Sequence, residues 1–278
     1  PVLYFPKFFH PDPTVERQSG LLKPTINNSN LLGSSLTLPY FKVISDNKDY
    51  TFSPTWFDND ILSLQNEYRQ VNKNSSLIAD VGYVKSYKSS ITQEKNNLTH
   101  LFGNFDLDLK FEKFNSSKLF FSIEQVSNDT YLKVFDANIT KSTLRPKNLN
   151  ILNNQIKLNL DHENYNLVTG FHAYENLQLS KSDRYQYILP YYNFDKILNK
   201  KYFNGSVEFT SKGSNNLNNT NDLKSNIINN VNFSSENFIT NLGFNNNLNV
   251  NLKNLNSLGK KNSDYKSSPQ IELIGLFE

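Results

Sequence analysis

The sequence predicts an all-β fold of the transmembrane-barrel type, and three observations lead to it. Apolar and polar residues alternate with a period of two along one segment after another, as in strands with one apolar and one polar face. The chain is 13% aromatic, with 21 Phe and 15 Tyr, yet its mean hydropathy is −0.57, a combination typical of barrels with an apolar outer row and a polar lumen row. It contains no apolar run of about 18 residues, so a membrane would have to be crossed by strands.

Composition and charge narrow the classes of partner. The 278 residues carry a formal net charge of +3 without blocks of like charge, so we expect no nucleic-acid partner. The sequence contains no Cys, which excludes disulfides and thiolate metal sites within it. Because it begins with Pro and contains no Met, we expect a piece of a longer protein, for which the missing export signal carries no information.

The first twenty residues predict the end of one domain and a linker. Residues 1–9 are aromatic and punctuated by proline, and residues 10–20 contain Pro11, Pro13 and Gly20, as linkers do. We therefore expect residues 1–19 to precede the sheet and residues 20–278 to form it.

The first two predicted strands, residues 21–30 and 32–44, contain Pro24 and Pro39 respectively. Proline has no N–H to give to a β-ladder, so both strands are expected to pair weakly. Ordinary edge-strand or bulge prolines are the alternative interpretation.

The clearest strand is predicted for residues 101–111, where odd-numbered positions are apolar apart from Gly103. The opposite face carries Asp106 and Asp108, and the same row extends to Glu112, so we interpret these carboxylates as facing a polar lumen. A soluble sheet with one wet face would show the same alternation. Repetition of the pattern favours a barrel, with roughly 12 to 14 strands of about 9 to 11 residues.

No catalytic, metal or cofactor site stands out. Asp106, Asp108 and Glu112 share one predicted face and could in principle act as paired acids, but a water-facing row is the simpler interpretation. His172 and Glu175 lie three apart on a predicted strand and therefore point to opposite faces, which argues against a shared metal ion. The sequence also lacks a Gly-rich phosphate loop, a Gly-x-Ser-x-Gly elbow and a Cys nucleophile. We predict a protein without enzymatic activity, metal or cofactor.

Four motifs in the first quarter of the chain carry a resemblance to a known family. In order, spacing and residue type they resemble the junction between periplasmic jelly roll and outer-membrane barrel in the LptD lipopolysaccharide-assembly family, also called the OstA or organic-solvent-tolerance family. Glu16 departs from a position that is often basic in that family, and beyond about residue 87 only the strand pattern agrees. The motifs are Arg17-x-Ser19-Gly20-Leu21-x-x-Pro24, Leu38-Pro39-Tyr40-Phe41, Asn47-x-Asp49-x-Thr51-x-x-Pro54 and Asn66-Glu67-x-Arg69.

The resemblance implies an integral barrel of the Gram-negative outer membrane that inserts lipopolysaccharide into the outer leaflet through a lateral gate. In the family that gate lies between the first and last strands, at the prolines that match Pro24 and Pro39. The family barrel is much larger than this chain, so we expect a partial, open barrel. The implied partners are lipopolysaccharide, outer-membrane lipid, a lipoprotein plug of the LptE type and a periplasmic bridge protein of the LptA type. The remaining matched junction residues are Arg17, Ser19, Gly20, Pro54, Asn66, Glu67 and Arg69.

Two other interpretations stay open. A soluble or surface β-rich binding module, such as an adhesin or a carbohydrate-binding sandwich, predicts two stacked sheets with interdigitating apolar faces. A generic porin-like barrel would have the same alternating strands but would lack the four motifs.

Overall fold

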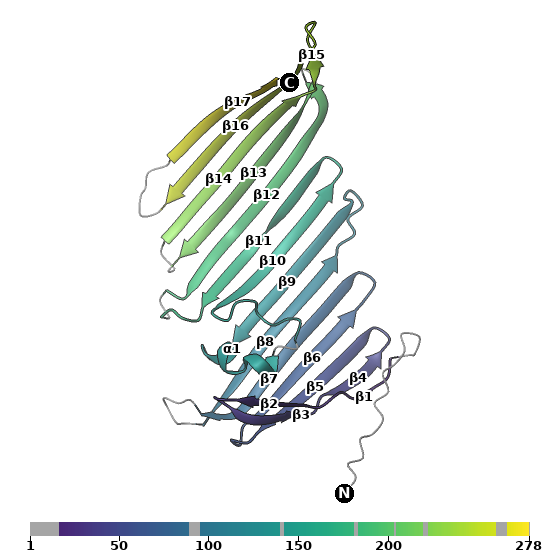
Figure 1. Cartoon of the computed structure of the whole chain (residues 1–278), viewed down its shortest axis with the longest axis vertical. Coiled ribbons are helices and arrows are strands. Elements are labelled where there is room, and N and C mark those ends of the chain that lie inside the picture. Colours follow the sequence, from purple (N-terminus) through teal and green to yellow (C-terminus); the bar gives the residue numbers. More distant parts are fainter. Residues whose placement is uncertain are drawn as a thin grey trace.

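The computed structural model of the chain describes residues 17–88, 95–139, 142–180, 183–202, 204–218, 222–259 and 266–277, which form one antiparallel sheet of 17 strands (Figure 1). The strands are β1 (Gly20–Leu21), β2 (Thr25–Ser29), β3 (Gly33–Thr37), β4 (Tyr40–Ser45), β5 (Lys48–Phe57), β6 (Leu62–Val71), β7 (Ser75–Lys88), β8 (Lys95–Asp108), β9 (Ser116–Val126), β10 (Ile151–His162), β11 (Tyr165–Asn176), β12 (Tyr185–Tyr202), β13 (Gly205–Asn218), β14 (Asp222–Ser235), β15 (Phe238–Ile239), β16 (Asn245–Gly259) and β17 (Lys266–Phe277). Two four-residue helices, α1 (Tyr131–Val134) and α2 (Asp136–Ile139), lie between β9 and β10.

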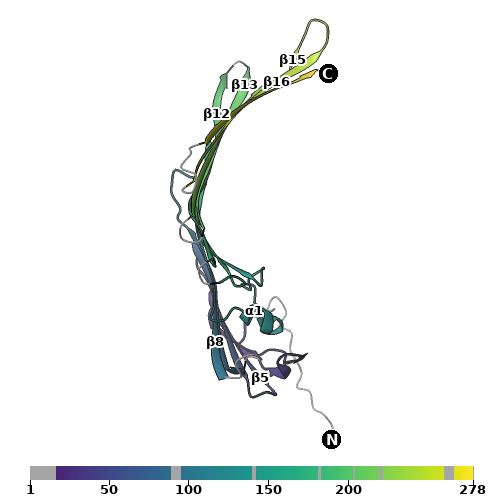
Figure 2. The ribbon, with the colours of Figure 1, turned by 90° about the vertical axis from the view of Figure 1, so that its left-hand side faces the viewer.

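The sheet is a curved wall that does not close. Strands pair in chain order from β5 to β14, then β14 pairs with β16 and β16 with β17. In the described residues β17 pairs with β16 alone, and the side view shows a single layer with α1 on its concave side (Figure 2). The prediction of an open, antiparallel, all-β sheet is confirmed. The described residues do not form the second stacked sheet that a sandwich requires.

The sheet is fewer than 17 strands wide, because some strands follow one another end to end at the same position in the sheet. β1 and β2 follow one another along the first edge, β3 and β4 along the second position, and β15 has only two residues. Counted by position, the described wall has fourteen strands, in agreement with the roughly 12 to 14 predicted. Those from β5 to β14 have 10 to 18 residues, so several exceed the predicted length.

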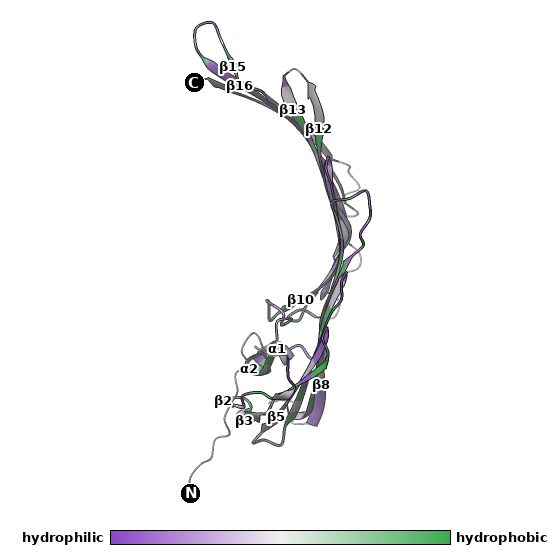
Figure 3. Ribbon diagram, turned by 90° about the vertical axis from the view of Figure 1, so that its right-hand side faces the viewer, coloured by the Kyte–Doolittle hydropathy of each residue, from purple (hydrophilic) through white to green (hydrophobic). Residues whose placement is uncertain are grey.

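The two faces of the wall differ in character. Phe105 lies opposite Phe121, Phe121 opposite Ile156, and Ile156 opposite Phe171, so one apolar row crosses four strands. The last three of these side chains are exposed. Their strand neighbours, such as Phe120, face the concave side that also carries α1, α2, β2 and β3 (Figure 3). The apolar row therefore covers the convex face.

A hydrophobic core lies against the concave face near the N-terminal strands, which the alternation alone does not predict. It joins the wall to residues 127–139 and 142–150, the described part of the segment between β9 and β10, which we call the inner segment. Its buried members are Leu32, Phe57, Ile61, Val84, Leu98, Phe102, Tyr131, Leu132, Phe135, Ile139, Leu144, Leu152 and Leu177.

Two expectations about the strands need correction. β8 ends at Asp108, so Glu112 lies in the turn after the strand and not in the row of Asp106 and Asp108. Residues 21–30 and 32–44 are each divided into two short strands at their proline. Residues 1–16, expected to belong to the end of a preceding domain and its linker, lie outside the described residues. Among the described helices, none is long and apolar enough to span a membrane.

Candidate functional site

Pro39 interrupts the second strand position between β3 and β4. Both strands nevertheless pair with β5 in one continuous register, with Thr37 opposite Thr55 and Tyr40 opposite Phe52. The interruption is therefore a gap in one ladder and not a loop that leaves the sheet.

Pro24 interrupts the first strand position between β1 and β2. Leu21 lies opposite Tyr40 and Thr25 lies opposite Thr37, so four residue steps on the first strand face three on the second. One extra residue is accommodated there, as in a β-bulge, and the strand can bend at that point. The two proline interruptions thus lie side by side at the first edge of the sheet.

Two hydrogen-bonded pairs at this edge are one-sided because of proline. The amide of Leu22 donates to the carbonyl of Pro39 over 2.8 Å, and the amide of Leu38 donates to the carbonyl of Pro54 over 3.2 Å. In an antiparallel ladder such pairs normally exchange two bonds, but Pro39 and Pro54 have no N–H to return. Each missing bond removes about 0.5–1.5 kcal/mol of net stabilisation. The seam, meaning the pairing of the first two strand positions with each other and with β5, is therefore weak.

Beyond the prolines, the β2–β3 hairpin leaves the direction of β1 and β4 and crosses the concave face (Figures 1 and 3). Leu32 at the hairpin turn is buried in the core with Phe57 and Phe135. Ile26 on the edge strand is 80% exposed. The hairpin is consequently held by its tip, while its edge remains open.

An ion-pair cluster fixes the end of the sheet where the described chain begins. Asp49, whose side chain is buried, binds Arg17 through one carboxylate oxygen and Arg69 Nε through the other, the latter over 2.7 Å. Arg69 also lies 3.5 Å from Glu67, and both guanidinium groups lie over the ring of Phe41. A buried carboxylate with two cationic partners is strongly held, so this end of β5 and β6 is anchored.

The remaining matched residues have distinct positions. The hydroxyl of Ser19 accepts a hydrogen bond from the amide of Val43 over 2.9 Å, next to Gly20 at the start of β1. Asn66 lies on the opposite face from the ion-pair cluster, and its side chain accepts a hydrogen bond from the Tyr50 hydroxyl. The structure thus gathers five of the seven expected junction residues at one end of the seam and separates Asn66 and Pro54 from them.

The inner segment is anchored to the wall by a buried polar network. Tyr131 Oη lies 2.6 Å from His100 Nδ1, His100 Nε2 lies 3.2 Å from Asp80 Oδ1, and Gln65 Nε2 donates to Asp80 Oδ2 over 2.8 Å. Tyr131, His100 and Asp80 are almost entirely buried. Because every member has a partner, the network stabilises the docked position of the segment.

This network is a structural anchor and not a nucleophilic site. Burial, reinforced by the charge of Asp80, raises the pKa of the Tyr131 phenol, so the phenol stays protonated and can donate to His100 Nδ1. His100 Nε2–H is then left to donate to Asp80. The ring of His100 lies so close to Gly82 that a Cβ there would be 2.1 Å from its Cε1 atom, so glycine is required at that position.

The inner segment also reaches the seam. Ser142 lines a cavity of about 550 Å³ together with Leu22, Pro39 and Phe41. The segment therefore extends along the concave face from the His100 anchor to the proline interruptions. The tip of the β2–β3 hairpin belongs to the same hydrophobic core as the inner segment.

No family model matches the chain, but curated relatives do. The LPS-assembly protein LptD of Idiomarina loihiensis is 28% identical over 137 residues, which are 49% of this chain and 17% of the relative. That of Nitrosospira multiformis is 31% identical over 141 residues, 50% of this chain and 14% of the relative, and that of Polaromonas sp. is 42% identical over 69 residues, 25% and 8%. This chain is LptD-like. The match spans less than a fifth of each of these relatives.

In the LptD-like chain the expected lumen row is shorter than predicted. Asp106 and Asp108 share the concave face with Phe102, because all three are even-numbered residues of β8. Asp108 accepts a hydrogen bond from the amide of Lys110, which caps the end of the strand. Across the described ranges, no three His, Asp or Glu side chains come together as metal ligands.

Sequence reasoning missed the residues that dock the inner segment onto the LptD-like wall. His100 directly precedes the strand predicted for residues 101–111, and nothing local distinguishes it or Asp80 from other polar residues. Their partner Tyr131 lies 31 residues from His100. The one available signal is the pair Gly82 and His100, since glycine within a strand often marks a close approach.

Proposed function

We propose that this LptD-like chain forms the first part of an outer-membrane β-barrel that inserts lipopolysaccharide into the outer leaflet through a lateral gate between the first and last barrel strands, and that the weak seam borders this gate. The proposal depends on one observation: Leu22 and Pro39 share a single ladder hydrogen bond in place of two, and so do Leu38 and Pro54. A wall that only has to enclose a pore gains nothing from a first edge weakened in two successive ladders.

The gate follows from the chemistry of the cargo. Lipopolysaccharide joins acyl chains, which belong in lipid, to a large hydrophilic sugar, which belongs in water. A concave face lined by groups such as Asp106 suits the sugar, and the convex row around Phe121 faces the membrane. Opening the gate sideways lets the acyl chains pass into lipid while the sugar leaves above the membrane. The few ladder bonds missing at the seam loosen the first strands beside the gate and bring that opening within thermal reach.

The wider assembly is part of the same proposal. The relatives are named as LPS-assembly proteins, and the family resemblance adds a lipoprotein plug of the LptE type within the barrel and a bridge protein of the LptA type in the periplasm. The chain acts here as a conduit without catalytic residues, so the energy for transport comes from elsewhere in the system.

The test replaces Pro24 and Pro39 together by alanine in the native protein and measures the rate at which newly made lipopolysaccharide reaches the cell surface. Restoring two N–H donors should strengthen the seam and slow delivery several-fold, at equal amounts of assembled protein. Pro269→Ala, in β17 far from the first edge, is the matched control and should leave the rate unchanged. Delivery at the normal rate in the double variant would contradict the gate.

A further inference from the structure

The connection between β14 and β16, residues 236–244, contains β15 and projects beyond the ends of the neighbouring strands (Figures 1 and 2). We call it the β15 loop. Four of its large apolar side chains are exposed, and that of Leu242 is 85% exposed. From Asn237 to Leu252 the chain carries no charged residue. An exposed apolar cluster of this kind marks a surface that meets lipid or another protein. The four side chains are those of Phe238, Ile239, Leu242 and Phe244.

Hydrogen bonds within the β15 loop hold its tip in one conformation. The amides of Thr240 and Gly243 donate to the carbonyls of Phe244 and Thr240 over 2.9 and 2.8 Å, and the Phe244 amide donates to the Thr240 hydroxyl over 3.2 Å. The side-chain amide of Asn246, which is almost entirely buried, donates to the carbonyls of Phe238 and Phe244. Polar groups that are bonded inside the loop lose less when its tip leaves water.

The convex face of the wall can be followed to this loop, because residues directly opposite one another in an antiparallel ladder share a face. Leu160 lies on the same face of β10 as Ile156, which belongs to the convex row. Alternation along β16 then puts Leu248 and Leu252 on the convex face with Asn254. The row that connects Leu160 to Asn254 runs through Leu167, Phe194, Ser211 and Asn229.

The β15 loop continues this alternation beyond the strand. Phe244 directly precedes β16 at an even-numbered position, and Phe238 lies opposite Asn246, so both fall on the convex side. Ile239 lies opposite Asn245 and falls on the concave side. The two phenylalanines therefore extend the convex apolar row of β16.

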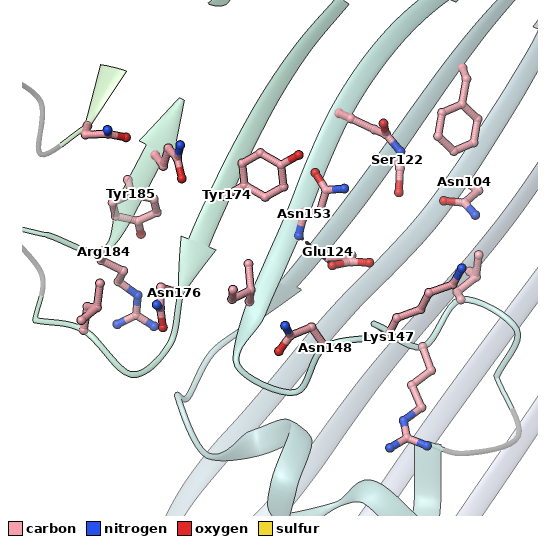
Figure 4. A pocket seen from close by; sticks show the side chains of 18 of the residues that line it. Asn104, Ser122, Glu124, Lys147, Asn148, Asn153, Tyr174, Asn176, Arg184 and Tyr185 are labelled. Atoms are coloured by element: carbon pink, nitrogen blue, oxygen red, sulfur yellow. Dashed lines mark hydrogen bonds between the residues drawn. The ribbon is translucent and has the colours of Figure 1, made fainter. Parts of the chain in front are cut away.

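Away from the hydrophobic core, the concave face of the same wall is polar. Its cavity of about 1050 Å³, formed by strands β8 to β13 and the inner segment, is lined by groups such as Glu124, Asn153 and Arg184 (Figure 4). On β14 and β16 the concave face carries Asn232 opposite Asn251. The phenylalanines on the convex side are therefore suited to a different medium from the one on the concave side.

The length of the convex apolar row explains why the loop projects. A tilted strand needs about 9 to 11 residues to cross the hydrocarbon of a bilayer. The apolar part of β16, from Leu248 to Leu252, has only five residues, and the next two convex positions, Asn254 among them, are asparagines. Counted back from Leu252, a crossing of about 9 residues begins at Phe244 and one of about 11 begins at Leu242. The loop thus supplies the missing part of the crossing.

We infer that the β15 loop is inserted into the membrane, with Phe238 and Phe244 among the acyl chains of the leaflet at its end of the wall. Lipid is the partner because the two rings continue the convex row, and because an uncharged, internally bonded tip suits hydrocarbon. The inference rests on the proposed function only in taking the convex face as the membrane face. It adds an anchor that holds this part of the wall at a fixed depth.

The experiment uses single cysteines, since the unaltered chain has none. Each variant of the full chain is labelled with a nitroxide and assembled in phosphatidylcholine vesicles. Electron paramagnetic resonance then measures collisions with oxygen, which concentrates in hydrocarbon, and with a nickel chelate, which stays in water. We expect the ratio of oxygen to nickel collisions to be several-fold higher for Phe244→Cys than for Ile239→Cys. Ile239 is the matched control because it is apolar and exposed on the same loop but lies on the concave side.

Two further labels calibrate the measurement. Leu248→Cys, on the convex face of β16, should give a ratio close to that of Phe244→Cys. Glu163→Cys, in the turn between β10 and β11 on the same edge of the wall, should give a ratio typical of water.

A ratio typical of water at Phe244→Cys, with a high ratio at Leu248→Cys, would overturn the inference. So would equal ratios at Phe244→Cys and Ile239→Cys, or protection of Phe244→Cys from both reagents, which would show that the loop packs against protein. Low ratios at both convex positions would overturn it together with the assignment of the membrane face.

The result is separable from the gate test. Normal delivery in the double proline variant together with a high ratio at Phe244→Cys would reject the gate alone. Slow delivery together with a ratio typical of water at Phe244→Cys would reject the membrane anchor alone.

Discussion

Pro54 withholds a hydrogen bond from the carbonyl of Leu38, although the sequence motif gives it no more weight than its neighbours. Pro54→Ala supplies the missing N–H and should stabilise the pairing of β3–β4 with β5 by about 0.5–1.5 kcal/mol. We expect the Leu38 amide to exchange with solvent more slowly. When Pro54→Ala is added to Pro39→Ala, lipopolysaccharide delivery should be slower than with Pro39→Ala alone. Pro269→Ala again serves as control, and faster exchange at Leu38 would show that the substitution strains the seam.

The sequence identified Pro24 and Pro39 but not this third proline of the seam. Proline chemistry is local, and any proline in a strand predicts a lost donor. Which carbonyl loses its partner depends on register, and register is a relation between two strands. Only the position of Pro54 directly opposite Leu38 shows that its missing N–H belongs to the seam.

The inner segment is the element on which the hairpin tip rests, so its docking should be sensitive to the buried network. Tyr131→Phe removes the hydroxyl that contacts His100 Nδ1 and leaves that nitrogen buried without its donor. We expect a loss of about 1–3 kcal/mol in the docking of the segment. Amide exchange in residues 131–139 should become faster.

Tyr185→Phe is a matched control for that substitution, because the Tyr185 hydroxyl makes a single 3.3 Å contact with Glu175 at an exposed site. It should leave exchange in residues 131–139 unchanged. If Tyr131→Phe also leaves exchange unchanged, apolar contacts such as those of Phe135 are sufficient to dock the segment.

Across the whole molecule, the orientation of the wall in a membrane can be tested with two adjacent residues. Phe121 belongs to the exposed convex row, whereas Phe120 faces the concave cavity. Phe121→Lys places a charge toward lipid and should destabilise the assembled wall by about 2–4 kcal/mol. Phe120→Lys puts the same charge between Asp106 and Lys157 on the concave side and should be tolerated far better.

The measurement is unfolding by denaturant after assembly in lipid vesicles, with the two variants compared at equal lipid. A larger loss for Phe120→Lys than for Phe121→Lys would reverse the assignment of the two faces. Equal losses would show that neither face meets lipid at this position.

The sequence by itself determined the class of fold, the number of strands across the wall and which residues share a face. These properties follow from a period of two and from the composition of each strand, both of which are local. The family resemblance also followed from local motifs within the first quarter of the chain.

Tertiary structure alone decided where the inner segment docks, which carbonyls lose a partner at the seam and which strands line the cavity beside the inner segment. Each depends on residues that are distant in the chain, as Tyr131 is from Asp80 and Asn148 from Phe120. Alternation fixes the face on which a side chain lies. Its partner there is set by register and by the path of a segment that has no periodic pattern of its own.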